Sequence, residues 1–394
     1  MDWLRNLRGV PLVATLALGL IGAWPDIGYA GPREQAKRIH DRIVGVPPSA
    51  AVLTSMEASI TGGDPIAAAY TAMSNPIFYT SSLKNFATPW TNVPETVFAD
   101  LNDYTATVIG MIRDDVPFDQ VLSADMVYVG AAGVVGTGYS QTDNIHYQQL
   151  EQTRADLSNP AVLVQRMQST LPGSQLAAGD TAGVITTRAA GEAFFSAGTN
   201  RRMWRFTAKN FLCRDMEQLN DITRPADRIR QDIGRSPGGD SRIFHNTCVG
   251  CHSGMDPLAG AFAYFEWDAM AGRVVFTRGS VAAKNLINAN TFPGGYVTID
   301  DNWVNMWRAG PNSSIGWRGP AGTGNGPKSL GIEVASSRAF SECQVTKVFR
   351  RVCLHAPESV SDAAMVQTIA NDFEAGNRSM KLVFAETAAY CMGN

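Results

Sequence analysis

The chain has 394 residues, of which 45% are hydrophobic and 18% are charged, a balance typical of folded globular protein that excludes wholesale disorder. Acidic and basic side chains nearly cancel, leaving a formal net charge of -3, so no electrostatic footprint favours nucleic acid or anionic lipid as a partner. At this length the chain can bury one large core or a few smaller ones.

The first 30 residues have the pattern of an export signal. Arg5 and Arg8 form a short basic region, residues 10–24 are uncharged and mostly apolar, and Gly28-Tyr29-Ala30 offers small residues for cleavage. An anchoring or buried helix is the alternative, but the apolar stretch is shorter than the roughly 20 residues that span a bilayer. We expect residues 1–30 to be a signal peptide and the mature chain, without a membrane span, to be periplasmic, extracellular or at the cell surface.

Apolar residues at helical spacing predict a mainly α fold with irregular connections. The expected helices cover residues 32–44, 93–111, 161–169, 201–219, 337–353 and 363–375. A break at Pro117 should precede a short helix over residues 119–126.

The remaining segments are interpreted as connections. Residues 130–138 form a glycine-rich loop without the lysine of a phosphate-binding loop, and residues 221–239 a charged surface connection. A small hairpin is expected at Pro293-Gly294-Gly295, and a long loop over residues 310–331.

Six cysteines follow the predicted signal peptide, and two of them stand in a special pattern. Cys248-Val249-Gly250-Cys251-His252 is the attachment pattern of c-type haem, in which two thiols bind one porphyrin covalently and the histidine binds its iron. We therefore expect one covalent haem c per chain, attached at Cys248 and Cys251, with His252 as an axial iron ligand.

Two other uses of this pattern are weaker. A zinc site would need two further ligands at comparable spacing, and no second Cys-x-x-Cys or His-x-x-x-His occurs. A dithiol redox site is expected in an alternating β/α context, which the chain lacks.

The other four cysteines form an even set, as two disulfides would require. Cys343 and Cys353 lie ten residues apart on one predicted helix, about 15 Å, which exceeds disulfide reach. Their partners should then be Cys213 and Cys391, in an order that the sequence leaves open. Four buried free thiols are the alternative.

The residues after the motif bear on the cofactor's surroundings. Asp256 and Pro257 have the character of a helix start, with the aspartate as N-cap. The apolar side chains that follow would either wall the porphyrin or fill the core. They are Leu258, Phe262, Phe265 and Trp267.

The second axial ligand is left open by the sequence. Met306 is the first candidate, Met270 and His355 are further ones, and an open position is the alternative. Met255 and His245 lie too close to the attachment turn to reach the opposite face of the haem. A methionine ligand suits electron transfer, whereas an open position permits peroxide or oxygen chemistry.

Several stretches carry a family resemblance. They are Asn210-Phe211-Leu212-Cys213, Cys248 to Phe262, and Glu266-Trp267-Asp268. They resemble the haem-binding module of uncharacterised cytochrome-c-containing families of planctomycetes and myxobacteria. Asp115-Val116-Pro117-Phe118 with Leu122 resembles a signature of the N-terminal helical domains of those families, and residues 337–343 resemble the start of their C-terminal helical domain.

The resemblance implies a helical N-terminal domain over residues 31–200, a haem module over 201–300 and a C-terminal helical domain with a loop-rich start over 301–394. Those relatives are often longer, with an additional N-terminal haem or carbohydrate-binding modules. This chain has one attachment motif, which disfavours a di-haem peroxidase mechanism within a single chain.

Three kinds of function are compatible with these features. An exported electron carrier with a redox partner protein is favoured. A haem oxidase, peroxidase or oxygenase, and a haem-bearing subunit of a larger complex, are the alternatives. No catalytic residue can be named, because Asp114 and Asp115 beside Arg113 suit a helix end. The oligomeric state stays open.

Overall fold

The computed structural model describes residues 30–196 and 198–393. The signal-peptide prediction thus lies, except for Ala30, outside the described residues. Helices account for 52% of the residues in the structure and strands for 7%, so the prediction of a mainly α fold is confirmed. The division into three domains stays a prediction.

The N-terminal region is a group of short helices that packs against the end of the chain. Its elements are α1 (Pro32–Val44), α2 (Ala50–Thr61), α3 (Pro65–Met73), η1 (Phe78–Ser82), α4 (Leu83–Ala87) and η2 (Thr88–Thr91). The bounds of α1 confirm the predicted helix. Helices α1 and α3 contact α14 (Met380–Tyr390), the last helix of the chain.

The most deeply buried helix is α5 (Asp103–Arg113), in which every residue is buried. The helix predicted over residues 93–111 begins ten residues late. The Asn92 side chain accepts from Thr96 N (2.9 Å) and closes a turn, and Asn102 then caps α5 by accepting from Thr105 N (2.9 Å).

A two-stranded ribbon follows. Strand β1 (Val127–Gly130) pairs antiparallel with β2 (Leu163–Arg166), with Val127 opposite Arg166. The helix predicted over residues 161–169 is therefore wrong, because a short apolar run has the same appearance in a strand and a helix. The short helix expected over 119–126 is a single 3₁₀ segment. The other elements here are η3 (Phe118–Leu122), α6 (Ile145–Gln152), η4 (Gln168–Thr170) and η5 (Gly183–Thr186).

The central part of the chain carries the predicted haem motif. Helix α8 ends seven residues before its predicted end, since Cys213 takes a left-handed conformation with φ 52°. The elements of this part are α7 (Arg188–Ala190), η6 (Gly191–Phe195), α8 (Arg201–Leu212), η7 (Pro237–Gly239), α9 (Ser241–Ile243), η8 (Phe244–Cys248), α10 (Val249–Ala259) and η9 (Gly260–Phe262).

Two hairpin-like ribbons come next, neither of them where one was predicted. The turn at residues 293–295 instead leads to Tyr296, which bridges Arg230. The loop predicted over 310–331 contains a strand and the start of α11, whose Pro327 occupies its first turn. The elements are β3 (Phe265–Asp268), β4 (Arg273–Phe276), η10 (Ala283–Asn285), β5 (Asn302–Val304), η11 (Met306–Arg308), η12 (Pro311–Ile315), β6 (Thr323–Asn325) and α11 (Gly326–Ala335).

The C-terminal part of the chain consists of α12 (Arg338–Cys353), α13 (Val360–Ala375) and α14, and two disulfides join α12 to the end of α8 and to the end of α14. Cys213 pairs with Cys343, and Cys353 pairs with Cys391. The predicted helix over 337–353 is confirmed, with Ser337 as its N-cap. Both disulfides confirm the expected partners and supply the order that the sequence left open.

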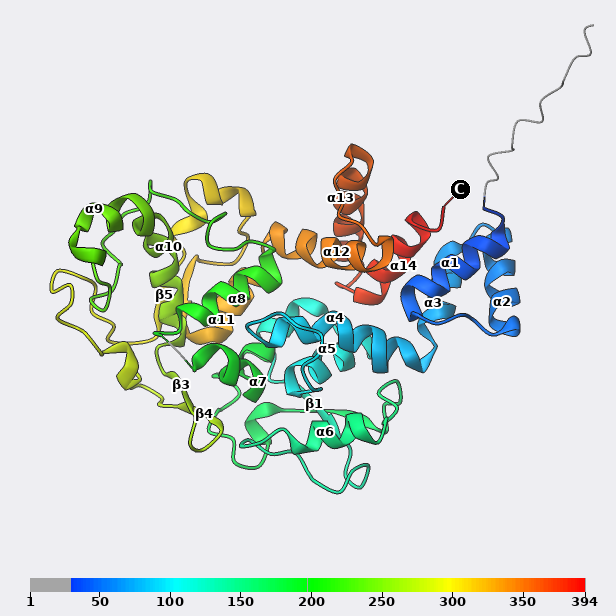
Figure 1. Ribbon diagram of the computed structural model, residues 1–394, viewed down its shortest axis with the longest axis horizontal. Coiled ribbons are helices and arrows are strands. Elements are labelled where there is room, and N and C mark those ends of the chain that lie inside the picture. Colours follow the sequence, from blue (N-terminus) through cyan, green and yellow to red (C-terminus); the bar gives the residue numbers. More distant parts are fainter. Residues whose placement is uncertain (1–29, 197, 394) are drawn as a thin grey trace, which may run out of the picture.

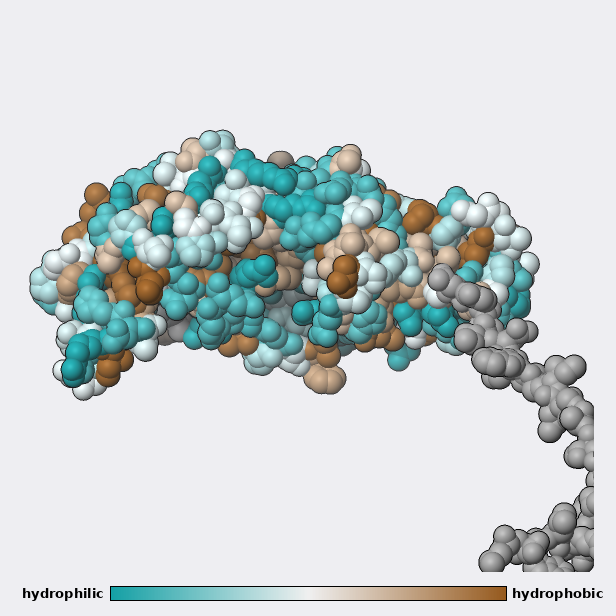
Figure 2. Space-filling model, turned by 90° about the horizontal axis from the view of Figure 1, so that it is seen from above, coloured by the Kyte–Doolittle hydropathy of each residue, from teal (hydrophilic) through white to brown (hydrophobic). Residues whose placement is uncertain are grey.

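The molecule is elongated, with α1 and α10 at opposite ends and α5, α8 and α12 between them (Figure 1). One face, seen in Figure 2, is largely hydrophilic over the middle and has apolar patches toward the α10 end. Among the described residues, no helix combines the length and apolar character needed to cross a membrane.

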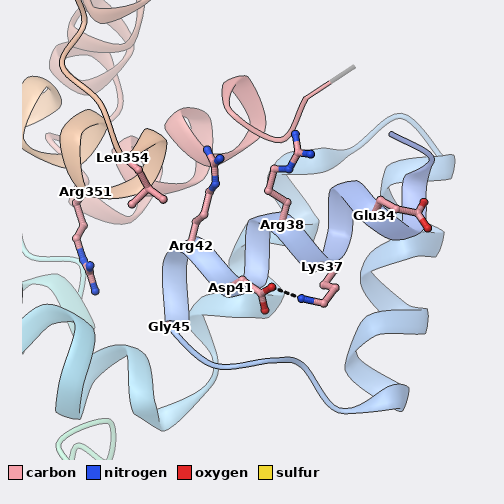
Figure 3. Close-up of a pocket in the computed structure, with 8 residues that line it drawn as sticks. All are labelled: Glu34, Lys37, Arg38, Asp41, Arg42, Gly45, Arg351 and Leu354. Atoms are coloured by element: carbon pink, nitrogen blue, oxygen red, sulfur yellow. Dashed lines mark hydrogen bonds and ion pairs between the residues drawn. The ribbon is translucent and has the colours of Figure 1, made fainter. Parts of the chain in front are cut away.

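A groove of about 430 Å³ opens between α1 and the C-terminal end of α12 (Figure 3). Its side chains are mostly basic. Lys37 pairs with Asp41, and Arg42 donates to the carbonyls of Val352 and Cys391 at 3.3 Å. This groove lies at the end of the molecule away from α10 and has no part in the site below.

Candidate haem-attachment site

The three residues of the predicted motif lie together where η8 meets α10. Cys248 ends η8, and Cys251 and His252 follow on the first turn of α10. Residues three and four positions apart on a helix share one face, so Cys248 lies on the same face as Cys251 and as His252, which adjoin one another on the first turn of α10. Both thiols are unpaired and half-buried, in contrast to the four disulfide-bonded cysteines.

The preceding loop holds this turn in place. The thiol of Cys251 donates to the carbonyl of Met216 at 3.3 Å, and Gly250 O accepts from Asp221 N at 3.0 Å. Ser253 donates to Asp221 O at 3.2 Å. The loop from 216 to 221 therefore covers the face of the motif that points into the protein.

Close packing against α10 leaves no room for a side chain at one of its glycines. A Cβ atom at Gly254 would lie 2.1 Å from the indole of Trp307, which is fully buried. Only glycine allows the Trp307 ring to lie this close to the helix. Element η11, which carries Met306 and Trp307, is thus packed directly against α10.

His252 is held by an aspartate one turn along the same helix. Its Nδ1 lies 2.9 Å from Oδ1 of Asp256. A carboxylate only accepts hydrogen bonds, so Nδ1 carries a proton, and the tautomer with its single proton at Nδ1 presents a lone pair at Nε2. Within the described part of the chain, Nε2 has no hydrogen-bond partner, and the side chain is 19% exposed.

Asp256 is itself completely buried and accepts from four donors. These are His252 Nδ1, Arg201 Nε (2.6 Å), Arg201 Nη2 (3.1 Å) and the backbone N of Arg230 (3.1 Å). Burial alone would raise the pKa of Asp256, but the Arg201 charge and the hydrogen bonds from His252 and Arg201 outweigh it. The pKa lies well below the usual range, so Asp256 is a carboxylate at neutral pH.

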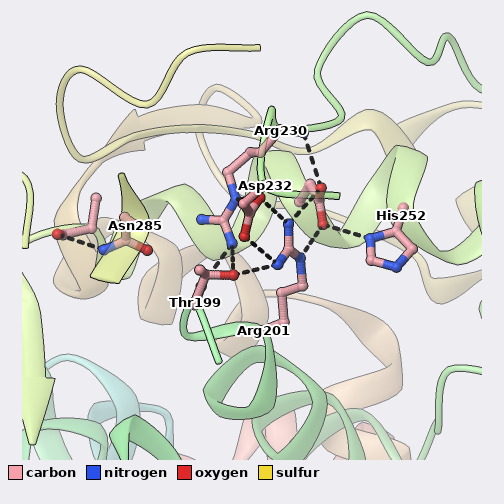
Figure 4. Close-up of polar contacts among 8 residues, drawn as sticks. Thr199, Arg201, Arg230, Asp232, His252 and Asn285 are labelled. Carbon is pink, nitrogen blue, oxygen red and sulfur yellow. Dashed lines mark hydrogen bonds and ion pairs between the residues drawn. The ribbon is translucent and has the colours of Figure 1, made fainter. Parts of the chain in front are cut away.

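Two arginines and two aspartates form a balanced buried cluster around this carboxylate. Arg201 also binds Asp232 with two hydrogen bonds of 2.8 and 2.9 Å, and Arg230 donates to Thr199. Figure 4 shows Asp232 between the guanidinium groups of Arg201 and Arg230, with His252 at the edge. Arg230 is 2% exposed, and its Nε and Nη1 lack hydrogen-bond partners within the described residues.

An aromatic ring flanks the imidazole on its other side. The Phe244 ring centroid lies 6.0 Å from that of His252, with the planes tilted by 34°. The guanidinium of Arg235 lies over Phe244 and over Phe292, at 5.1 and 3.6 Å from the ring centroids. Arg235 therefore adds a third guanidinium group near the motif, stacked on aromatic rings.

Two interpretations of the sequence need correction here. Asp256 is not a helix N-cap, because α10 begins at Val249 and contains Pro257 near its C-terminal end. The segment over residues 221–239 is not simply a surface connection, since Asp221, Ile229 and Arg230 are buried. The first difference places Asp256 beside His252, and the second places Arg230 beside Asp256.

The apolar residues predicted to wall a porphyrin or fill the core do the latter. Phe262 and Phe265 are fully buried, with ring centroids 5.9 and 5.4 Å from that of Phe195. Leu258 is equally buried, and the half-buried Trp267 carries the Arg188 guanidinium at 5.3 Å.

The candidates for the second axial ligand lie in different places. Met306 is half-buried on η11, beside α10. Met270 is fully exposed in the turn between β3 and β4. His355 follows α12, with its Nδ1 donating to Ala356 O and its ring lying edge-on to Phe349. Of the three, Met306 is the one whose element packs against the motif helix.

The thiol of Cys251 is not tuned for thiol redox chemistry. Burial raises its pKa, and Glu217, Cys248 and Asp215 raise it further. Reactive dithiols have lowered thiol pKa values. No cluster of three or more His, Cys, Asp or Glu side chains that could hold a metal ion occurs within residues 30–196 and 198–393.

Comparisons with protein-family models, curated proteins and solved structures found no match to this chain. The residue types present nevertheless fit a c-type haem, which needs two free thiols and an imidazole with its outer nitrogen unoccupied and its inner one held.

Sequence reasoning missed Arg201, Arg230 and Asp232. Only the contact between His252 and Asp256 could have been predicted, because these residues are four positions apart and so lie one turn apart on a helix. The arginines and Asp232 come from distant segments, and nothing in their spacing indicates that they meet.

Proposed function

We propose that this protein is an exported cytochrome with one covalently attached haem c, and that it carries electrons to or from a redox partner protein. The observation that carries the proposal is the pairing of two free thiols with an imidazole whose Nδ1 is bound by Asp256 and whose Nε2 is free.

The division of the cysteines supports this proposal. Two disulfides are typical of an exported protein. Cys248 and Cys251, three residues apart, are the two cysteines left unpaired. Thioether bonds to a porphyrin would use both.

The roles of the residues follow from their positions. Cys248 and Cys251 would hold the porphyrin covalently, and His252 would bind the iron through Nε2. The iron of a bound haem supplies one-electron chemistry. Asp256 orients the imidazole, and the loop at Met216 shields one side of the turn.

The part of the chain that carries the motif also exposes apolar side chains that an apolar group or partner could cover. Several large ones are exposed over residues 222–299, and Ile222 lies beside Gly250 of the motif. They include Ile222, Ile243, Leu286, Ile287, Val297 and Ile299. Apolar patches at this end are visible in Figure 2.

The resemblance to planctomycete and myxobacterial haem-binding families belongs to the same proposal, as do its three domains and export by the signal at residues 1–30. Electron transfer is favoured over haem catalysis because Met306 lies on an element packed against α10. A methionine there as second ligand would close the iron to substrates.

The test is expression of the full chain in a host with a c-type haem ligation system, followed by pyridine haemochrome spectra and intact mass. We expect one haem per mature chain, and carbon monoxide should not bind to the untreated ferrous protein. Replacing Cys248 and Cys251 with alanine should abolish the covalent haem.

Two matched controls make this test specific. Replacing Cys353 and Cys391 removes the same number of thiols elsewhere and should leave the covalent haem in place. His245→Ala, at an exposed histidine seven residues before His252, should leave the spectrum unchanged, whereas His252→Ala should alter the coordination. A colourless wild-type protein without added mass would overturn the proposal.

A further inference from the structure

We infer, on the basis of the function proposed above, that Asp256 is a positioning residue that makes His252 a strongly basic axial ligand and thereby lowers the reduction potential of the haem. The juxtaposition of a fully buried carboxylate with the Nδ1 of the predicted iron ligand carries this inference.

The carboxylate is fixed in both position and charge state. Asp256 is 1% exposed, and its two oxygens accept from Arg201, Arg230 and His252. A group held by four hydrogen bonds has little freedom to turn away from the imidazole. The 2.9 Å bond is therefore a permanent feature of the ligand.

A carboxylate acceptor changes the imidazole more than a neutral acceptor does. Hydrogen bonds to an ionised group are about twice as strong as neutral ones, and a carboxylate behind a metal-bound histidine raises the basicity of that ligand. A more basic ligand donates more electron density to the iron. This stabilises the ferric state, which carries one positive charge more than the ferrous state, and lowers the reduction potential.

The surrounding charges allow the effect of the Asp256–His252 hydrogen bond on the reduction potential to be separated from the effect of a buried negative charge alone. Arg201 and Arg230 carry two positive charges, and Asp232 and Asp256 two negative ones, so the cluster has no net charge. The two aspartates both bind Arg201, but only Asp256 touches His252. Asp232 is therefore a matched control within the chain.

The experiment compares Asp256→Asn with Asp232→Asn in the haem-loaded full-length protein by spectroelectrochemical titration. Each variant removes one buried negative charge beside Arg201. We expect Asp256→Asn to shift the ferric–ferrous equilibrium toward ferrous by about tenfold more than Asp232→Asn does, which is ~59 mV for a one-electron couple. Asp256→Glu, which keeps the charge, should restore most of the wild-type potential.

Equal shifts in the two asparagine variants would overturn the inference while leaving the proposed function intact, because both variants would still carry haem. Should Asp256→Asn fail to fold, the iron–histidine stretch in resonance Raman spectra of the ferrous Met306→Ala variant, in which the proposed second ligand is removed, gives the answer. We expect a higher frequency than in a reference cytochrome c whose histidine donates to a backbone carbonyl. An equal or lower frequency overturns the inference.

Discussion

The two ends of helix α8 show two different ways of holding a protein together. At its first residue, Arg201 joins a buried cluster of charges around Asp256 and His252. After its last residue, the half-buried Cys213 is joined by a disulfide to the buried Cys343 of α12. The disulfide stabilises its region of the fold whether or not a ligand is bound. The charge cluster, which costs desolvation to bury, is directed at one histidine. The buried charge cluster, rather than the disulfide, therefore indicates which region of this protein is specialised for a function.

The largest expected effect is at the disulfide end. Replacing Cys213 and Cys343 with alanine should lower the free energy of unfolding by about 5 kcal/mol, because the bond closes a long loop, with a sequence separation of 130 residues. The pair Cys353 and Cys391 closes a separation of 38 and should cost about 1 kcal/mol less. Urea denaturation of both double variants measures this difference. A larger loss at the shorter loop would show that packing, rather than loop closure, dominates this region.

The second effect tests the charge cluster. Arg201→Met leaves the Asp256 carboxylate buried without its ion-pair partner and should cost at least about 3 kcal/mol in urea denaturation. Arg205→Met, one turn along the same helix, is the control. Arg205 pairs with Asp215 but its side chain is 44% exposed, and we expect a loss below about 1 kcal/mol. Similar losses at both positions would remove the distinction between the buried cluster and an ordinary surface pair.

The smallest effect concerns a single carboxyl group in α14, the helix that ends just before Cys391 of the second disulfide. Burial and the charge of Asp372 raise the pKa of Glu386 to about 7, from 4.5. The folded state then binds this proton more tightly than the unfolded state, so the contribution to stability falls as pH rises from about 4.5 to about 7. Glu386→Gln cannot ionise and should raise the melting temperature at pH 8 but not at pH 4.

The control for this pH effect is Glu358→Gln, at an exposed glutamate before α13. Its melting temperature should follow that of the wild type at both pH values. A difference between Glu386→Gln and wild type that is the same at pH 4 and pH 8 would contradict the assignment of the effect to ionisation.

The long, strongly patterned helices could be predicted from sequence, and the short elements could not. Helices α1 and α12 have apolar residues at regular helical spacing and clear ends, with Pro32 opening the first and Ser337 capping the second. Strand β2 has only four residues, and its identity depends on pairing with β1 across 32 intervening positions or more. Tertiary contacts of that kind leave no local pattern.

The same distinction applies to the site. The three residues of the motif lie within five positions of one another, and the structure brings them to one turn where η8 meets α10. The partners of Asp256 come from α8 and from the irregular segment before η8, and their meeting depends on the whole fold. Pro257 misled the prediction because it is more often found in the first turn of a helix than near its end.

The Cys213–Cys343 bond also has a consequence for biosynthesis. It closes the intervening chain into a covalent ring, and Cys248 and Cys251 lie inside that ring. Under the proposed function, four cysteines must form the two disulfides during export while Cys248 and Cys251 must stay available for haem, and any mispairing would use a thiol that the other process needs. The order in which oxidation and cofactor ligation occur should therefore govern the yield of correctly assembled molecules.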